Sequence, residues 1–194
     1  MINLAILASG NGTNAQRLIE YFSASKEISV KCVIYNRKDA YVAQRAKSLG
    51  TPAHYFKKTA FEDGTVNEFL KTEGIDYVIL AGFLLLIPQN ILDSFQRRII
   101  NIHPALLPSY GGKGMYGSHV HEAVIAAHEK ESGITIHVID GDYDRGETIF
   151  QARCTITADD TPDTLAAKIH TLEQRHFPVV VEEYIRKHEG IVTE

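Results

Sequence analysis

The fold of this chain is decided by the stretch INLAILASGNGTN at residues 2–14. Residues 2–8 form an apolar run typical of a buried strand, and residues 9–14 form a glycine-rich turn. The segment after the turn carries apolar residues at helical spacing, namely Ala15, Leu18, Ile19 and Phe22. A strand, a tight turn and a helix in this order predict the first unit of an α/β fold, whose turn lies where open α/β sheets bind ligands.

Short apolar runs and helical patterns continue to alternate through the first hundred residues, which is typical of βαβ units and a parallel sheet. We expect strands at 28–35, near 53–55, at 77–81 and at 98–103, and helices at 40–49 and 61–73. The run YVILA at 77–81 shows no polar alternation, as expected when helices cover both faces of a sheet.

The pattern changes after residue 103. A glycine-rich loop at 109–118 precedes a predicted helix near 119–130, and strands at 134–139 and 148–152 flank an acidic turn as an antiparallel hairpin. The last helix has Thr161 as its N-cap and Pro162 at its first position, and we expect Pro178 to kink or divide it. We therefore predict an α/β fold in one domain over residues 1–194, with a doubly wound, mostly parallel, Rossmann-like sheet, an antiparallel C-terminal hairpin and a long C-terminal helix.

Composition excludes several classes of function. Lys and Arg number 20 against 24 Asp and Glu, so we expect no nucleic-acid partner. The only cysteines, Cys32 and Cys154, form no CxxC pair, which argues against a disulfide framework or a zinc cluster. No segment approaches about 20 uninterrupted apolar residues, so we expect a soluble, cytoplasmic protein without a membrane partner.

The glycine turn is a candidate anion site. Backbone N–H groups and a helix N-terminus converge there, and phosphate is the ligand that this arrangement favours. A tight turn that needs positive φ would explain the glycines equally well. Gly10, Gly12 and Ala15 also fit the dinucleotide pattern GxGxxA, but that motif expects an acid near the end of the second strand, where YNR stands at 35–37. A single phosphate fits better, because Thr13 and Asn14 add side-chain donors.

A second candidate site follows the strand at 98–103. Asn101 and His103 lie on one face of that strand, and Pro104 ends it. The acidic turn 140–146 could add a carboxylate from Asp144. An amide that polarises a carbonyl, an imidazole that exchanges protons and a carboxylate that keeps the imidazole charged suggest acyl-type transfer to an amine. Taken singly, Asn101 could cap a turn and His103 could be structural.

The acidic turn also has Asp140, Asp142 and Asp144 at the first, third and fifth positions of a calcium loop. The sixth position is Arg145 and the twelfth is Gln151, which argues against calcium. We expect His137 to have a structural or supporting role. The remaining histidines form no metal-ligand spacing, and we expect most of them to be surface residues or hydrogen-bonded within the fold: His54, His119, His121, His128, His170, His176 and His188.

The chain resembles the phosphoribosylglycinamide formyltransferase family over essentially its whole length. The resemblance is carried in order by Ser9–Asn14, Leu80–Phe83, Asn101–Pro108, Gly133–Val138, and Asp144 followed by Gly146. It implies transfer of a formyl group from 10-formyltetrahydrofolate, as co-substrate, to the amine of N1-(5-phospho-D-ribosyl)glycinamide in de novo purine (IMP) biosynthesis. It further implies that small molecules are the partners and that no metal is required.

The resemblance also implies roles for individual residues. It assigns Asn101, His103 and Asp144 to catalysis. It assigns four residues to the ribonucleotide: Gly12, Thr13, Asn14 and Glu173. It assigns eight to folate: Leu84, Leu85, Leu86, Ile87, Asn101, Asp140, Gly141 and Asp144.

Two features depart from the family. Its members carry an Arg just after an Ala-Phe pair, whereas Ala60-Phe61 is followed here by Glu62-Asp63-Gly64, so recognition of the glutamate tail of folate stays open. The loop 111–117 is longer than in some relatives, and Lys113, Met115 and Tyr116 either close over the site or belong to a mobile spacer.

Other functions remain open at this stage. The first is a related enzyme that acts on formylated folate: formyltetrahydrofolate hydrolase, methionyl-tRNA formyltransferase or a sugar formyltransferase. The second is a noncatalytic nucleotide-binding module. A monomer and a homodimer are both compatible with the sequence.

Overall fold

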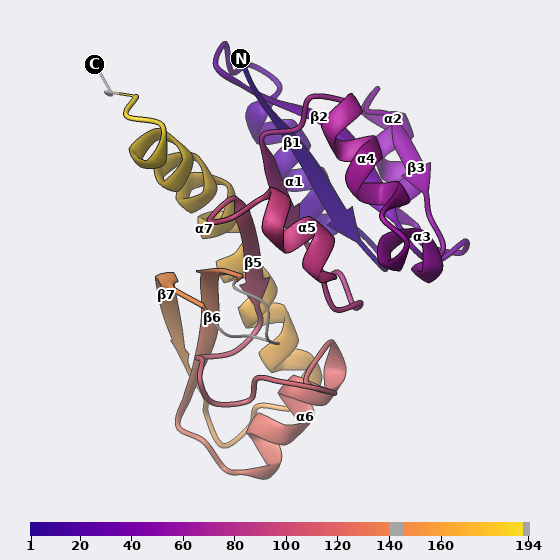
Figure 1. Cartoon of the computed structure of the whole chain (residues 1–194). Coiled ribbons are helices and arrows are strands. Elements are labelled where there is room, and N and C mark those ends of the chain that lie inside the picture. Colours follow the sequence, from indigo (N-terminus) through magenta and orange to yellow (C-terminus); the bar gives the residue numbers. More distant parts are fainter. Residues whose placement is uncertain (140–145, 192–194) are drawn as a thin grey trace.

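The computed structural model describes residues 1–139 and 146–191, and over these residues seven strands form one sheet in the order β3-β2-β1-β4-β5-β6-β7 (Figure 1). The first five strands pair in parallel, and β6 is antiparallel to both β5 and β7. This confirms the predicted mostly parallel sheet with an antiparallel hairpin at its end. The strands are β1 (Ile2–Ala8), β2 (Ile28–Tyr35), β3 (Ala53–Tyr55), β4 (Tyr77–Leu80), β5 (Ile99–His103), β6 (Glu131–Val138) and β7 (Thr148–Thr155).

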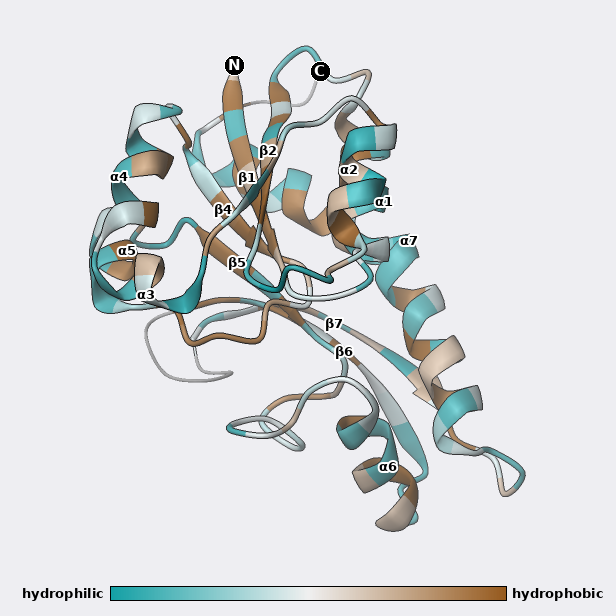
Figure 2. Ribbon diagram, turned by 90° about the vertical axis from the view of Figure 1, so that its right-hand side faces the viewer, coloured by the Kyte–Doolittle hydropathy of each residue, from teal (hydrophilic) through white to brown (hydrophobic). Residues whose placement is uncertain are grey.

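Helices cover both faces of the parallel part of the sheet, as Figure 2 shows. They are α1 (Thr13–Phe22), α2 (Val42–Ser48), α3 (Lys58–Glu62), α4 (Thr65–Thr72), α5 (Gln89–Ser94), α6 (Ser118–Ala126) and α7 (Pro162–His188). Apolar side chains of α1, α2, α6 and α7 share one core cluster, and those of α3, α4 and α5 share another. Alternate residues of each central strand point into one or the other cluster, so both faces of the sheet are buried.

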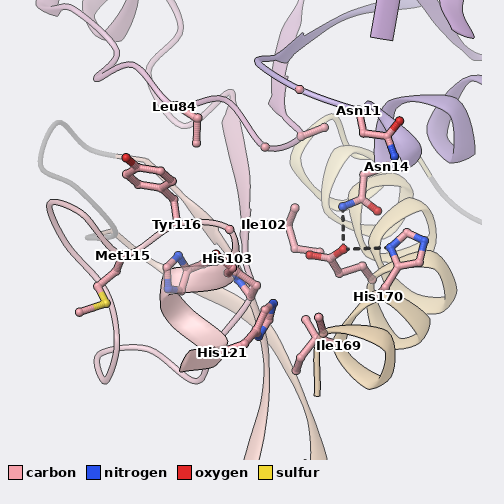
Figure 3. A pocket seen from close by; sticks show the side chains of 18 of the residues that line it. Asn11, Asn14, Leu84, Ile102, His103, Met115, Tyr116, His121, Ile169 and His170 are labelled. Atoms are coloured by element: carbon pink, nitrogen blue, oxygen red, sulfur yellow. Dashed lines mark hydrogen bonds and ion pairs between the residues drawn. The ribbon is translucent and has the colours of Figure 1, made fainter. Parts of the chain in front are cut away.

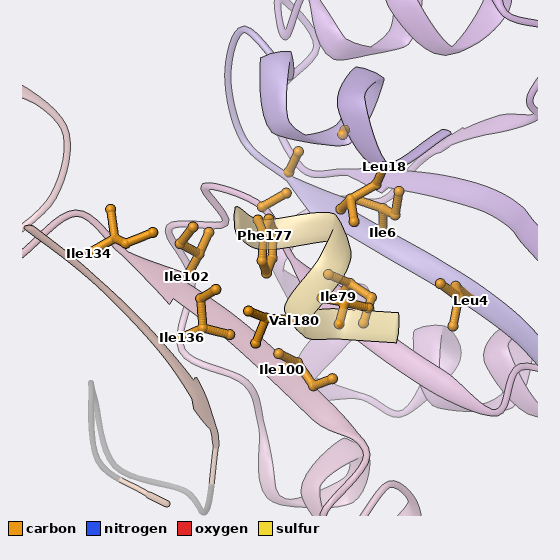
Figure 4. Packing of buried hydrophobic residues seen from close by; sticks show 14 of the residues in the cluster. Leu4, Ile6, Leu18, Ile79, Ile100, Ile102, Ile134, Ile136, Phe177 and Val180 are labelled. Carbon is orange, nitrogen blue, oxygen red and sulfur yellow. The ribbon is translucent and has the colours of Figure 1, made fainter. Parts of the chain in front are cut away.

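The strands β1 and β4 show why their sequences lack polar alternation. Leu4 and Ile6 face the first cluster together with Ile79, whereas Leu7 and Val78 face the second. The first cluster continues along β5 and β6 to α7, where Phe177 and Val180 lie against the isoleucines of these two strands (Figure 4). This packing fixes β5 relative to α7, and both elements carry candidate site residues.

The long helix α7 begins as predicted, because the side chain of Thr161 accepts a hydrogen bond from the backbone N–H of Thr164 and Pro162 follows it. Of the two expectations for Pro178, division of the helix is wrong, since α7 continues to His188, and a kink there stays a prediction. Pro178 cannot donate to the carbonyl of Gln174 four residues earlier. Nε of Arg17, on α1, donates to that carbonyl at 3.2 Å, which satisfies it from outside the helix.

The helix expected at 61–73 is two helices, α3 and α4. Gly64 adopts the left-handed conformation (φ 88°) before α4, and Oδ1 of Asp63 accepts from the backbone N–H of Thr65 at 3.0 Å. A left-handed residue cannot continue a right-handed helix, so the chain restarts there. The short helix α5 was not predicted, because six residues are too few for a periodic pattern. No helix among the described residues is long and apolar enough to cross a bilayer.

Candidate active site

A cavity of about 880 Å³ lies at the carboxyl ends of β1, β4 and β5 (Figure 3). Its wall is formed by residues 10–14 after β1, 81–84 after β4, 101–104 at the end of β5 and the loop 112–118. Residues of α6 and α7 close the remaining side. Because parallel strands end at the same edge of a sheet, the segments 10–14, 81–84 and 101–104 lie together there.

The glycine turn forms one end of the cavity, with Asn11 and Asn14 beside it in Figure 3. Gly12 is the N-cap of α1 with φ 78°, and a Cβ atom there would lie 2.3 Å from Cγ2 of Val42. The N–H of Val42 donates to the carbonyl of Gly10 at 3.1 Å, and Nε of Arg45 donates to that of Asn11 at 2.8 Å. These bonds hold the turn against α2 and leave the positive N-terminal end of α1 at the cavity.

Asn14 connects the turn to α7. Its Nδ2 donates to Oε2 of Glu173 at 3.0 Å, and its Oδ1 accepts from Nε2 of Gln174 at 2.7 Å. Nδ1 of His170 lies 3.5 Å from the same Glu173 oxygen, and this carboxylate raises the pKa of His170. The side-chain amide of Asn14 therefore already makes two hydrogen bonds to α7. The cavity wall also carries the Glu173 carboxylate paired with the His170 imidazole.

The carboxyl end of β5 forms another part of the cavity wall. Asn101 and His137 are directly opposite each other in the antiparallel pairing of β5 with β6, and Nδ2 of Asn101 lies 3.0 Å from Nε2 of His137. The amide nitrogen has no acceptor character, so Nε2 of His137 accepts this bond. His103 is 3% exposed, and its Nε2 lies 2.7 Å from the carbonyl oxygen of Tyr110. Tyr110 has a left-handed backbone conformation, with φ 55°.

Thr135 supports the chain that follows His103, and it is itself opposite His103 in the sheet. Its hydroxyl donates to the carbonyl of Ala105 at 2.7 Å and accepts from the backbone N–H of Leu107 and from Nε2 of Gln151, each at 2.9 Å. A fully buried hydroxyl with three partners fixes the turn 104–107, and thereby the exit of the strand that carries both candidate residues.

Comparison with known proteins identifies the family. Residues 2–181 match the formyl transferase family. The chain belongs to the formyl transferase family. Among the residues that the structure describes, no group of three or more His, Cys, Asp or Glu side chains is arranged to hold a metal ion.

Individual members of the family are similar to the chain over most of its length. It is 40% identical over 185 residues to the chloroplastic phosphoribosylglycinamide formyltransferase of Arabidopsis thaliana, covering 92% of this chain and 63% of that protein. It is 30% identical to the Escherichia coli (strain K12) phosphoribosylglycinamide formyltransferase, covering 93% and 85%. The crystal structure of the Bacillus halodurans enzyme of that name is 33% identical, with a TM-score of 0.88 over 99% of this chain and 100% of that one. The chain spans 63% and 59% of the lengths of two plant relatives that it matches.

The structure of this formyl transferase places most of the predicted site residues at one cavity. Asn101 and His103 from β5 line it, and so do Gly12, Thr13, Asn14 and Glu173 from the glycine turn, α1 and α7. Asp140, Gly141 and Asp144 lie outside the described residues, so their place in the site stays a prediction.

The predicted folate segment is only partly at the cavity. Leu84 lines it, whereas Leu85 packs against the core cluster on the other face of the sheet and Ile87 is buried in that cluster. Leu86 is 48% exposed. Folate binding by all four residues, Leu84 to Ile87, stays a prediction. From the longer loop, Lys113, Met115 and Tyr116 all line the cavity.

Two histidines that were given no functional role from the sequence line the cavity of this formyl transferase. His121 is buried at the cavity, and its Nδ1 has no hydrogen-bond partner within residues 1–139 and 146–191. His170 also lines the cavity. Its spacing of three residues from Glu173 on a predicted helix was a usable signal, because such residues share a helix face. His121 gave no such signal, since only the docking of α6 on α7 brings it to the site.

Proposed function

We propose that this chain transfers the formyl group of 10-formyltetrahydrofolate to the amine of N1-(5-phospho-D-ribosyl)glycinamide, a step of de novo purine biosynthesis. The observation that carries the proposal is that one cavity joins an anion-binding helix N-terminus to the Asn101–His103 pair. The named relatives support the choice of substrates. The volume of the cavity is within the usual range of small-molecule sites, about 300–1,000 Å³.

The acceptor is oriented by its phosphate. We place the phosphate at Gly12, Thr13 and Asn14, where backbone N–H groups at the start of α1 donate to it. Glu173 faces the ribose, since a carboxylate that already accepts from Asn14 suits hydroxyl donors and repels phosphate. This orientation directs the glycinamide amine along the cavity toward Asn101 and His103.

The chemical step is direct attack. The neutral amine forms a bond to the formyl carbon, and the bond from that carbon to N10 of the folate breaks. One N–H of Asn101 is bound to His137, and the second donates to the formyl oxygen. Protonated His103 stabilises the oxyanion, Asp144 holds that imidazole charged, and the proton lost by the amine is relayed to N10. None of these steps uses a metal.

The decisive measurement is the dependence of folate release on the acceptor. Purified protein should release tetrahydrofolate from 10-formyltetrahydrofolate only when the ribonucleotide is supplied, equally well with and without a chelator. Release without an acceptor would identify a hydrolase, transfer only to a sugar amine or methionyl-tRNA would identify another formyltransferase, and binding without turnover would leave a nucleotide-binding module.

The roles of the side chains are tested separately. His103→Ala and Asp144→Asn should each lower kcat by orders of magnitude without unfolding the protein. His128→Ala, a substitution of an exposed histidine on no cavity wall, serves as the matched control. Near-normal turnover in either of the first two variants would contradict the mechanism.

A further inference from the structure

The backbone of Tyr110 contacts His103, the histidine of the proposed mechanism. Nε2 of His103 lies 2.7 Å from the carbonyl oxygen of Tyr110, seven residues further along the chain. A carbonyl oxygen can only accept a hydrogen bond, so Nε2 is the donor and carries a proton. This holds for the neutral ring as well as for the charged one. The proton that the ring gains or loses is therefore the one on Nδ1.

The side chain of Tyr110 is anchored in two ways. Its hydroxyl donates to Oε1 of Glu129, just beyond α6, at 2.7 Å. Its apolar part packs against the core cluster that contains side chains of α6 and α7. Tyr110 lines a second cavity, of about 260 Å³, together with Val124 and Glu129, whereas His103 lines the larger one. The tyrosine side chain thus lies at a cavity other than the one proposed for the substrates.

The backbone of Tyr110 adopts a conformation that a tyrosine rarely takes. Its φ of 55° is left-handed, which is unfavourable for a residue with a bulky side chain. Such conformations persist only where the surrounding contacts determine them, and they are concentrated at functional sites. The bond to Glu129 and the packing of the ring are contacts that hold Tyr110 in place, with its carbonyl at the imidazole.

We propose that Tyr110 is a positioning residue for His103. Its carbonyl keeps the proton on Nε2, so that the ring changes charge at Nδ1 and keeps one orientation while the substrates react. This proposal rests on the proposed function, because it concerns the histidine of the same mechanism. The hydroxyl of Thr135 fixes the chain that leaves β5, and the carbonyl of Tyr110 fixes the ring.

Steady-state kinetics test the positioning role. Tyr110→Gly removes the hydroxyl and the ring, and glycine takes the left-handed conformation at no steric cost. The carbonyl then loses its anchors, so kcat should fall about tenfold, the worth of one hydrogen bond, with little change in the KM of either substrate. Tyr110→Phe keeps the ring on the core cluster and should retain most of kcat. The matched control is Ser109→Gly, which adds a glycine at an exposed position of the same loop and should leave kcat and both KM values unchanged.

Nitrogen NMR of the wild-type chain gives a measurement that depends neither on turnover nor on the folding of a variant. Through a pH titration, Nε2 of His103 should keep its proton, and Nδ1 should be the nitrogen that loses one. In Tyr110→Gly the neutral ring should populate both tautomers. Loss of the proton from Nε2 in the wild type, or equal kcat values for Tyr110→Gly and Ser109→Gly, would overturn the proposal. If the wild type transfers no formyl group to the ribonucleotide, the proposed function fails, and the titration still decides which nitrogen of His103 keeps its proton.

Discussion

Asn101 and His137 face each other across β5 and β6, with Nδ2 of the amide 3.0 Å from Nε2 of the imidazole. The two residues belong to a row of polar side chains, at positions 101, 103, 135 and 137, on one face of the two strands. The alternate row, Ile100, Ile102, Ile134 and Ile136, packs in the cluster that contains α7. Burial of the isoleucines thus determines which way the polar row points.

His137 should matter for turnover more than for binding. His137→Phe removes the acceptor that orients the amide of Asn101, so kcat should fall about tenfold, the worth of one well-placed hydrogen bond, with little change in either KM. His137→Gln retains an acceptor and should retain more of kcat. Equal kcat values for the wild type and His137→Phe would show that Asn101 does not need this bond.

Gly12 should tolerate no side chain. Gly12→Ala combines a left-handed backbone with a Cβ atom 2.9 Å from the backbone Cα of Val42, so we expect a loss of about 1–3 kcal/mol in the free energy of unfolding and a raised KM for the ribonucleotide. The control is Gly10→Ala in the same turn, where a Cβ atom would meet nothing within 4 Å. Urea denaturation compares the two variants, and equal losses would contradict the steric argument.

Thr135→Val should lower both stability and kcat. The substitution keeps the shape of the side chain and removes the hydroxyl that Ala105, Leu107 and Gln151 share, so the free energy of unfolding should fall by about 1–3 kcal/mol. Thr135→Ser keeps the hydroxyl and should preserve kcat. A normal kcat in Thr135→Val, or a loss in Thr135→Ser alone, would contradict the role of the hydroxyl.

The pair of His170 with Glu173 should make stability depend on pH. Glu173 raises the pKa of His170 above its ordinary 6.5, so the stabilisation is complete below that value and is lost as pH rises through the higher, folded-state pKa. The side chain of His170 is 46% exposed, which limits the effect to well under about 1 kcal/mol. Thermal unfolding of the wild type and of His170→Gln should differ more at pH 5.5 than at pH 8.5, and the opposite order would refute the assignment.

Arg17 and Pro178 should be energetically coupled through the carbonyl of Gln174. Arg17→Met removes the donor to that carbonyl and should cost about 1 kcal/mol in the native chain. Pro178→Ala restores a backbone N–H four residues after Gln174, so Arg17→Met should cost less in that background. A double-mutant cycle measures this coupling. If the two substitutions change the free energy of unfolding additively, the hydrogen bond from Arg17 to the carbonyl of Gln174 does not compensate for Pro178.

Local chemistry accounts for the elements that were predicted correctly. The apolar run of β4, the periodic face of α1 and the cap formed by Thr161 and Pro162 each depend on neighbours within a few residues. The break at Gly64 and the continuity of α7 through Pro178 were missed for opposite reasons. Glycine takes helical and left-handed conformations about equally readily, so the sequence did not show that Gly64 would be left-handed. Pro178 is tolerated because a side chain from α1 reaches the carbonyl of Gln174.

The sequence by itself determined the class of sheet, the glycine turn at the start of α1 and the placement of Asn101 and His103 on one strand face, because periodicity and backbone restrictions act over short distances. Only the tertiary structure decided that His121 and His170 join these residues, and that Asn14 is held by α7. The contact of Asn14 with Glu173 joins residues 159 apart in the chain, and all these arrangements follow from how buried faces of helices and strands pack together, which no local pattern records.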